Sequence, residues 1–247
     1  MSANEIPGKI MTEGQGVDGL VMVLTRPSDF SQEDAWAAWY DDVQLPETGA
    51  ASGARVVTHW QVADRPAGFS PVQGFTHVDF YEYDDGRRGL RDLLDAFDAQ
   101  RVAGRTHPCH SVVGVDAFES TGRWARPTAH GPALTGHVMS YVMTNDPSRA
   151  DEWNAWLDNV HVPDMIGSGA FVNARRWHRL DPARYGANYL TVYDVELDDL
   201  NQAVKLSGMV MPDLLRAGRM YTEHYGGMRA MLEPSGRYGA TGWVSGE

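Results

Sequence analysis

The stretch from Trp153 to Gly169 reads WNAWLDNVHVPDMIGSG, and an earlier part of the chain repeats its pattern. The Trp-x-x-Trp motif at 153–156 also occurs at 36–39, and the residues that follow the two motifs match in order. The further matches are Asp41 with Asp158, Val43 with Val160, Pro46 with Pro163, and Ser52-Gly53-Ala54 with Ser168-Gly169-Ala170. Such an ordered series indicates an internal duplication, which governs how the rest of the sequence is interpreted.

Around these anchors each half shows the same succession of periodic segments. Apolar residues at i, i+3, i+4 and i+7 predict first helices at about 32–43 and 149–160, with capping boxes at 31–34 and 148–151. Pro212 is expected to break or kink the last helix, which starts near Leu200. The other predicted elements are strands at 20–25, 55–62, 75–83, 111–118, 137–143, 174–180, 189–195 and 224–232, and a helix around 90–97.

The order β-α-β-β-α-β, found twice, is typical of ferredoxin-like units. We therefore predict an α+β protein built from two tandem ferredoxin-like βαββαβ units. Each sheet would carry helices on one face only, so we expect the units to pack sheet to sheet as an intrachain dimeric α/β barrel. The predicted divisions are a tail (1–18), a first repeat (19–119), a linker (120–134), a second repeat (135–233) and a second tail (234–247).

The composition argues against several partners and cofactors. The formal net charge of −12 disfavours nucleic acid, and no apolar run approaches the roughly 20 residues of a membrane span. The polar N-terminus lacks the apolar segment of a signal peptide, which predicts a cytoplasmic protein. Cys109 is the single cysteine, and the stretch HPCH at 107–110 lacks zinc-ligand spacing, so we expect neither a disulfide nor a metal. Phosphate-loop, Rossmann and nucleophile-elbow motifs are missing, so no cofactor is expected.

The stretch at 153–169 resembles the helix-1 signature of EthD-like dimeric α/β-barrel proteins, which has helix aromatics, then His-x-Pro, then a turn of small residues. His161-Val-Pro163 matches this signature, whereas the first copy reads Gln44-Leu-Pro46 and lacks the histidine. The resemblance covers about 19–232 and implies the fold, with a pocket between sheet and helices and His161 at its edge. It does not imply one chemistry, because the superfamily includes lyases, isomerases, cyclases, cofactor-free oxygenases and haem proteins.

His161 is the leading candidate for a catalytic residue. It borders the apolar helix face, and Asp158, three positions earlier, could orient its imidazole or raise its pKa. An imidazole held in this way suits general acid–base catalysis, although a histidine stabilised by the helix dipole, with Asp158 in solvent, is the alternative. Tyr141 and Arg176 are candidates for stabilising an oxyanion; a satisfied core tyrosine and a surface arginine are the alternatives.

Further side chains are predicted to bind the substrate. His137 and Tyr141 stand where the first repeat has Leu20 and Leu24, and a polar group on an apolar face costs stability unless it is bonded. A filled core is the alternative for the aromatic members. The predicted substrate-binding residues are Trp153, Trp156, Trp177, His137, Met139, Tyr193 and His224.

A secondary cluster lies in the first repeat. His77 and Asp79 share one face of a strand, and His59 lies on the neighbouring strand. This pattern indicates a proton relay or a buried polar network. Tyr193 is expected to occupy the position of Asp79 in the second repeat.

These residues favour a cofactor-independent enzyme, a lyase or an isomerase/cyclase, acting on a small aromatic or polyketide-like molecule. The alternatives are a cofactor-free monooxygenase on a phenolic substrate, a haem protein with His161, His224 or His110 as axial ligand, and a non-catalytic binder of hydrophobic molecules. Gln44 in place of a histidine favours the C-terminal pocket as the active one. Exposed edge strands would allow a homodimer.

Overall fold

A computed structural model describes residues 9–10, 18–63, 74–125, 134–182, 187–221, 224–239 and 242–245. The chain divides into two compact units. The N-terminal unit comprises 16–120 with 179–181 and 232–247, and the C-terminal unit comprises 1–15, 121–178 and 182–231. Among the described residues, no helix has the length and apolar character needed to cross a membrane.

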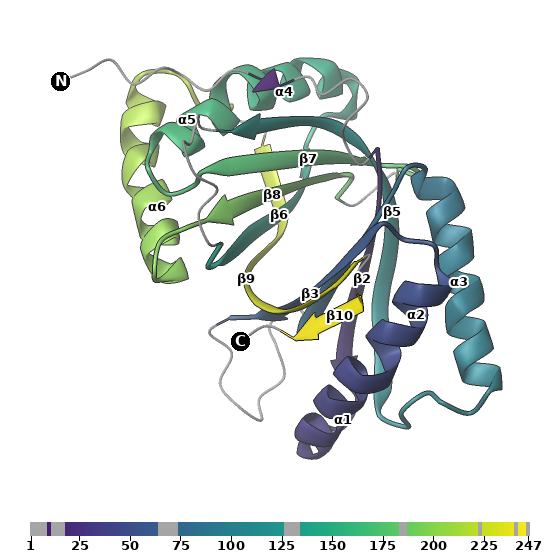
Figure 1. Ribbon diagram of the computed structural model, residues 1–247. Helices are drawn as coiled ribbons and strands as arrows, with labels where there is room; N and C mark the ends of the chain where they lie inside the picture. The colour runs from purple at the N-terminus through teal and green to yellow at the C-terminus, as the bar shows by residue number, and fades with distance from the viewer. Residues whose placement is uncertain are drawn as a thin grey trace. The chain divides into compact units, whose positions relative to one another are not determined.

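The N-terminal unit contains an antiparallel sheet in the order β5-β2-β4-β3, with helices on one face (Figure 1). Residues 232–238 of β9 continue this sheet next to β3. Apolar side chains of β2 and β4 pack against the helices, around the fully buried Trp36. The elements are β2 (Gly19–Pro27), α1 (Glu33–Trp39), α2 (Leu45–Ala51), β3 (Val56–Val62), β4 (His77–Tyr83), α3 (Gly86–Val102) and β5 (His110–Ala125).

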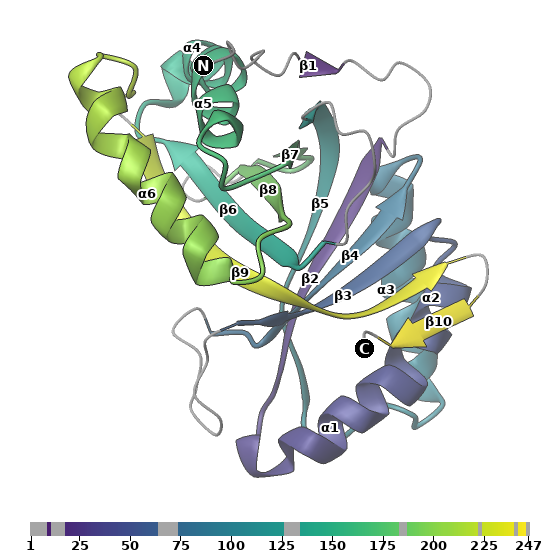
Figure 2. The ribbon, with the colours of Figure 1, turned by 60° about the vertical axis from the view of Figure 1, so that its left-hand side comes forward.

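The C-terminal unit repeats this arrangement with the strand order β9-β6-β8-β7 (Figure 2). Its elements are β6 (Gly136–Thr144), α4 (Ala150–Trp156), α5 (Val162–Gly167), β7 (Asn173–Arg179), β8 (Tyr189–Val195), α6 (Leu200–Arg216) and the first part of β9 (His224–Gly239), with the short strand β1 (Lys9–Ile10) on β5. The short strand β10 (Gly242–Ser245) pairs with the last residues of β9 in the N-terminal unit. The α+β class and the β-α-β-β-α-β order are therefore confirmed. Packing of the two units sheet to sheet stays a prediction.

The first helix of each unit is longer than its pattern predicts. A π-helical turn follows α1 at Tyr40–Gln44 and α4 at Leu157–His161, and each leads into another helix. The backbone N–H of Val162 donates to Leu157 O, a wider spacing than in an α-helix. Pro163 lies in the first turn of α5, where its missing N–H is tolerated. The prolines therefore start new helical segments instead of ending the helix.

The predicted capping boxes are wrong. The carboxylate of Asp29 accepts the backbone N–H of Ser31 at 2.9 Å, and that of Asp146 accepts the N–H of Ser148 at 3.0 Å. These aspartates cap short 3-10 turns, Phe30–Gln32 and Pro147–Arg149, that precede the helices. Aspartate is an N-cap residue as effective as serine, so the cap lies two residues earlier than predicted.

Pro212 does not break the last helix, because α6 continues through it to Arg216. The helix is anchored by its buried face, which includes Leu200, Ala203 and Ser207. Packing thus overrides the unfavourable local preference of one proline.

The pairing register corrects the predicted match between Tyr193 and Asp79. In each unit the third strand pairs with the first, and corresponding positions of the first strands are known from the repeat. By this criterion Thr191 matches Asp79, and Tyr193 matches Tyr81. In the N-terminal unit, Asp79 pairs with Val23 and Tyr81 pairs with Val21. In the C-terminal unit, Thr191 pairs with Ser140, which corresponds to Val23, and Tyr193 pairs with Val138, which corresponds to Val21.

The long strands overlap the predicted linker and tail. β5 extends to Ala125, beyond the predicted start of the linker, and β9 extends to Gly239, into the predicted second tail. Residues 126–133 of the linker lie outside the described residues. The predicted divisions stay predictions there.

Candidate functional site

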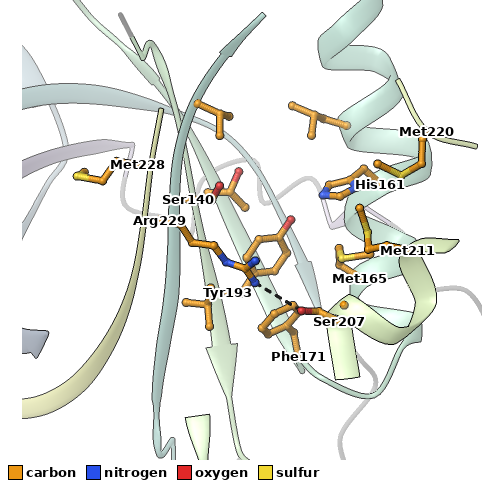
Figure 3. A pocket seen from close by; sticks show the side chains of 15 residues that line it. Ser140, His161, Met165, Phe171, Tyr193, Ser207, Met211, Met220, Met228 and Arg229 are labelled. Carbon is orange, nitrogen blue, oxygen red and sulfur yellow. Dashed lines mark hydrogen bonds between the residues drawn. The ribbon is translucent and has the colours of Figure 1, made fainter. Parts of the chain in front are cut away.

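A cavity of about 330 Å³ lies in the C-terminal unit between strands β6, β8 and β9 and the helical segments opposite them (Figure 3). Its walls are mostly apolar, and a few polar groups converge on it, which is typical of a small-molecule site. The lining residues are Val138, Ser140, Val142, Leu157, His161, Met165, Phe171, Thr191, Tyr193, Ser207, Gly208, Met211, Met220, Met228 and Arg229.

The cavity exists because two side chains are short. In the N-terminal unit the matching positions hold Tyr40 and Asp79, and the Tyr40 hydroxyl donates to Asp79 Oδ2 at 2.5 Å. Both are buried, with exposed fractions of 1% and 0%. The C-terminal unit has Leu157 in place of Tyr40 and Thr191 in place of Asp79, and both line the cavity. These shorter side chains therefore leave space in the C-terminal unit.

The imidazole of His161 forms part of the cavity wall, as the sequence predicts for this residue. His161 is the last residue of the π-helical turn, and its half-buried ring lies 4.9 Å from that of Trp156, centroid to centroid. The indole N–H of Trp156 donates to the backbone oxygen of Arg219 at 2.7 Å, and Arg219 pairs with Asp164 at 2.6 Å. These contacts fix the aromatic ring against which the imidazole packs.

Asp158 pairs with an arginine, and this partner was not predicted. Its carboxylate accepts a hydrogen bond from the Arg176 guanidinium, which also donates to Asn154 Oδ1 at 2.7 Å. Arg176 exposes 1% of its surface and lies 6.0 Å from the Trp153 ring, so it is not a surface arginine. Burial lowers its pKa and the Asp158 charge raises it, so the guanidinium remains charged. This pair lies beside the cavity, and neither residue lines it.

Arg229 is a polar wall residue that the sequence analysis missed. It lies on β9, and its guanidinium donates to Ser207 Oγ at 3.5 Å across the cavity (Figure 3). Tyr193 lines the same space, and burial raises its pKa to about 12 while Arg176 and Arg229 oppose the rise. The phenol is therefore neutral. An arginine within the stretch GGMRAMLE was the available signal for this residue.

Several predicted substrate-binding residues lie on the opposite face of the sheet. Val138, Ser140 and Val142 face the cavity, so the intervening His137, Met139 and Tyr141 do not line it. The same holds for Trp177, which adjoins the helix-facing Arg176 on β7. Trp153 is fully buried 4.8 Å from the Tyr189 ring and does not line the cavity. The side chain of His224 lies outside the described residues.

His137 belongs to a separate buried polar group. Its Nδ1 lies 3.1 Å from Asp194 Oδ1, and Asn173 donates to Asp194 Oδ2 at 2.6 Å. Burial lowers the pKa of His137. Burial raises the pKa of Asp194, but its hydrogen bonds and the nearby positive charges together outweigh this effect and hold that pKa well below its usual value. The imidazole and the carboxylate thus form a close buried pair on neighbouring strands.

The secondary cluster of the N-terminal unit is assembled as a buried network. His59 Nδ1 lies 2.6 Å from Asp79 Oδ1, and the His59 and His77 rings stack at 5.0 Å. Tyr40, missed in the sequence analysis, completes the network through its hydrogen bond to Asp79. The exposed fractions of His59, His77 and Asp79 are 2%, 5% and 0%, so this cluster is a core feature of its unit.

His110, beside this network, predicts a pH-dependent stability. Burial lowers its pKa to about 4 from 6.5; Asp79 opposes the change and His107 adds to it. Because the folded state binds the proton more weakly, this contribution is present above pH 6.5 and is lost as the pH falls toward 4. Between pH 7 and pH 4, we expect the unfolding free energy of the wild type to fall by about 3 kcal/mol more than that of His110→Gln. Urea unfolding at several pH values tests this, and parallel curves for wild type and variant would contradict it.

No protein-family model matches the chain, and no curated protein matches it. Solved structures do match. An anthrone oxidase-like protein has a TM-score of 0.62 at 12% identity over 94% of this chain and 98% of that chain. A monooxygenase-like protein from Fusobacterium nucleatum has a TM-score of 0.56 at 10% identity over 94% and 98%, and a variant chlorite dismutase from Candidatus Nitrospira defluvii has 0.54 at 11% over 89% and 92%.

At this identity the likeness shows the fold alone. These neighbours are dimeric α/β-barrel proteins, and the α+β fold of the chain matches theirs. Membership of the EthD-like branch stays a prediction.

Proposed function

We propose that the chain is an enzyme that moves a proton on a small, largely apolar or aromatic molecule held in the C-terminal cavity, with His161 as the proton carrier and without a cofactor. The observation that carries this proposal is one cavity whose wall includes both the His161 imidazole and the Arg229 guanidinium. Methionine and aromatic walls suit a flat apolar substrate, because thioether side chains adapt to irregular shapes. That the neighbours include monooxygenase-like proteins and a chlorite dismutase supports an enzyme of some kind.

The chemistry follows from the charges that the residues carry. In its neutral form, the His161 imidazole accepts a proton from a carbon or oxygen next to a carbonyl or on a phenol, and returns it elsewhere on the substrate. Arg229 stabilises the oxyanion that forms, which is the role predicted above for Tyr141 and Arg176. Lyases and isomerases or cyclases need only these groups, and they are the reactions we favour. Asp158 and His161 belong to the same π-helical turn, and Asp158 pairs with Arg176. Through this pair, Asp158 holds the turn that positions His161.

A screen of small aromatic and polyketide-like compounds, with product analysis by mass spectrometry, tests the proposal. Conversion at constant dissolved oxygen supports a lyase or isomerase. Binding of compounds without any product in the whole screen would indicate a non-catalytic carrier and would contradict the proposal of an enzyme.

A cofactor-free monooxygenase is the second candidate, favoured by neighbours described as monooxygenase-like and anthrone oxidase-like. It would use the same first step, because removal of a proton from a phenol produces an anion that reacts with dioxygen. Oxygen consumed in proportion to product separates it from the first candidate.

The cavity does not fit haem. Its volume of about 330 Å³ lies at the lower end of ligand pockets, whereas a haem macrocycle with its propionates needs a far larger space. Of the predicted axial ligands, His110 instead accepts a weak hydrogen bond from Trp36 at 3.4 Å in the other unit. An absorbance scan of the purified protein checks this, and a Soret band would contradict it.

Filling the cavity should abolish ligand binding without unfolding the protein. We expect the double substitution Leu157→Tyr and Thr191→Asp to reproduce the Tyr40–Asp79 hydrogen bond and occupy the space. Calorimetric titration with 1-naphthol, a small aromatic probe, should lose its binding signal, and the melting temperature should stay close to that of the wild type. Leu157→Met, which preserves volume, is the matched control and should still bind. Unchanged binding in the double variant would show that the probe lies elsewhere.

A further inference from the structure

The buried network of the N-terminal unit has the geometry of a redox-active tyrosine. The Tyr40 hydroxyl donates to Asp79 Oδ2 at 2.5 Å, and the other oxygen of this carboxylate lies 2.6 Å from His59 Nδ1. Tyr40, Asp79 and His59 expose 1%, 0% and 2% of their surface. A substrate needs access to the groups that transform it, whereas an electron can leave a buried ring through neighbouring rings.

Such rings connect Tyr40 to the protein surface. The Trp36 and Tyr40 centroids are 4.7 Å apart, and Trp39 meets Tyr40 edge-on at 5.8 Å. Trp36 is fully buried, but Trp39 is partly exposed, and its indole N–H donates to Arg105 O at 2.8 Å. This hydrogen bond fixes the orientation of the outer ring. The Trp39 ring therefore links the phenol to the surface, and the Trp36 ring packs on the phenol within the core.

The carboxylate supplies what oxidation of a buried phenol requires. Loss of an electron alone would leave a cationic ring in the core, which is costly without compensation. With Asp79 in place the proton moves along an existing short hydrogen bond as the electron leaves, so the ring becomes a neutral phenoxyl radical. Burial and the Asp79 charge raise the pKa of Tyr40 well above its ordinary value, so the starting state is the neutral phenol.

We propose that Tyr40 donates one electron, by way of Trp39, to an oxygen-centred radical at the surface of the N-terminal unit, and gives its phenolic proton to Asp79. The O–H bond of Tyr40 breaks. The electron and a proton from water reduce the oxidant RO• to ROH and leave a hydroxide ion, and the phenoxyl radical and the protonated Asp79 remain. A thiol then supplies one electron while Asp79 returns its proton to the phenoxyl oxygen, which restores both groups. The thiol becomes a thiyl radical, and its proton neutralises the hydroxide. This activity does not depend on the chemistry proposed for the C-terminal cavity.

The chain offers a matched control in the same sheet. Tyr81 is as deeply buried as Tyr40, but its hydroxyl lies 3.0 Å from the hydroxyl of Thr48. A hydroxyl is a much weaker proton acceptor than a carboxylate, so the Tyr81 radical should be less accessible. In the C-terminal unit Leu157 and Thr191 replace Tyr40 and Asp79, so this hydrogen-bonded pair of a tyrosine and a carboxylate occurs in the first copy and not in the second.

The experiment oxidises the full-length protein with photogenerated tris(bipyridine)ruthenium(III) and follows radicals by transient absorption and freeze-quench EPR. The wild type should give a tyrosyl signal that narrows when the tyrosines are ring-deuterated. Tyr40→Phe should lose most of this signal, and Tyr81→Phe should keep it. Trp39→Phe should slow its formation, and Asp79→Asn should lower its yield.

Several results would overturn the proposal. These are a tyrosyl signal that survives in Tyr40→Phe, a signal lost in Tyr81→Phe instead, or a wild type that yields tryptophan radicals alone. Circular dichroism and thermal melting confirm that each variant is folded. If Tyr40→Phe does not fold, the decision falls to Trp39→Phe, whose substitution lies at the surface, and an unchanged rate there would refute the path.

Discussion

His161→Gln should lower kcat by roughly 10²–10⁴-fold, because an amide cannot exchange a proton with the substrate as an imidazole does. Glutamine is the informative replacement, since Gln44 occupies this position in the other copy and lies buried at the same end of a π-helical turn. The helix is therefore expected to keep its geometry. Turnover of the substrate found in the product screen is the measurement.

Two comparisons separate a catalytic loss from a structural one. Binding of 1-naphthol should be nearly unchanged in His161→Gln, because the methionine wall remains. His107→Gln, in the other unit, should have wild-type turnover. Wild-type kcat in His161→Gln would remove the acid–base proposal, whereas loss of both binding and fold would indicate a packing role for the imidazole.

Asp158→Ala should destabilise the protein by about 3–5 kcal/mol, since it leaves the Arg176 guanidinium buried without its carboxylate. Arg176 exposes 1% of its surface, and Asn154 and the Trp153 face cannot neutralise its charge. For a chain of this size the melting temperature should fall by roughly 6–20 °C. Calorimetric melting and urea unfolding both test this expectation.

A double substitution and an exposed pair serve as controls. Asp158→Ala combined with Arg176→Met should recover much of the lost stability, because it removes the uncompensated charge. Glu152→Ala breaks the exposed pair with Arg149, which is 2.6 Å long, and should cost at most about 1 kcal/mol. A small effect of Asp158→Ala would mean that solvent reaches the guanidinium. If the folded variant also shows a shifted pH profile of kcat, Asp158 influences His161 in addition to its structural role.

The sequence predicted the elements well where the signal was periodic and local. Helix faces, alternating strands and the duplication itself follow from spacings within a few residues. It failed at prolines, because Pro46 and Pro163 begin helical segments and Pro212 lies within one. It also failed where a polar side chain had to be matched with a distant partner.

The sequence by itself determined that the chain is an α+β duplication. It also determined that His161 in one copy corresponds to Gln44 in the other, which is the main chemical difference between them. Only the tertiary structure decided that Leu157 and Thr191 leave a cavity where Tyr40 and Asp79 meet, that Asp158 holds Arg176, and that Arg229 joins His161. The reason is physical. Periodicity encodes which face of an element is buried, whereas cavities and ion pairs depend on strand register and on side chains that meet from remote parts of the chain.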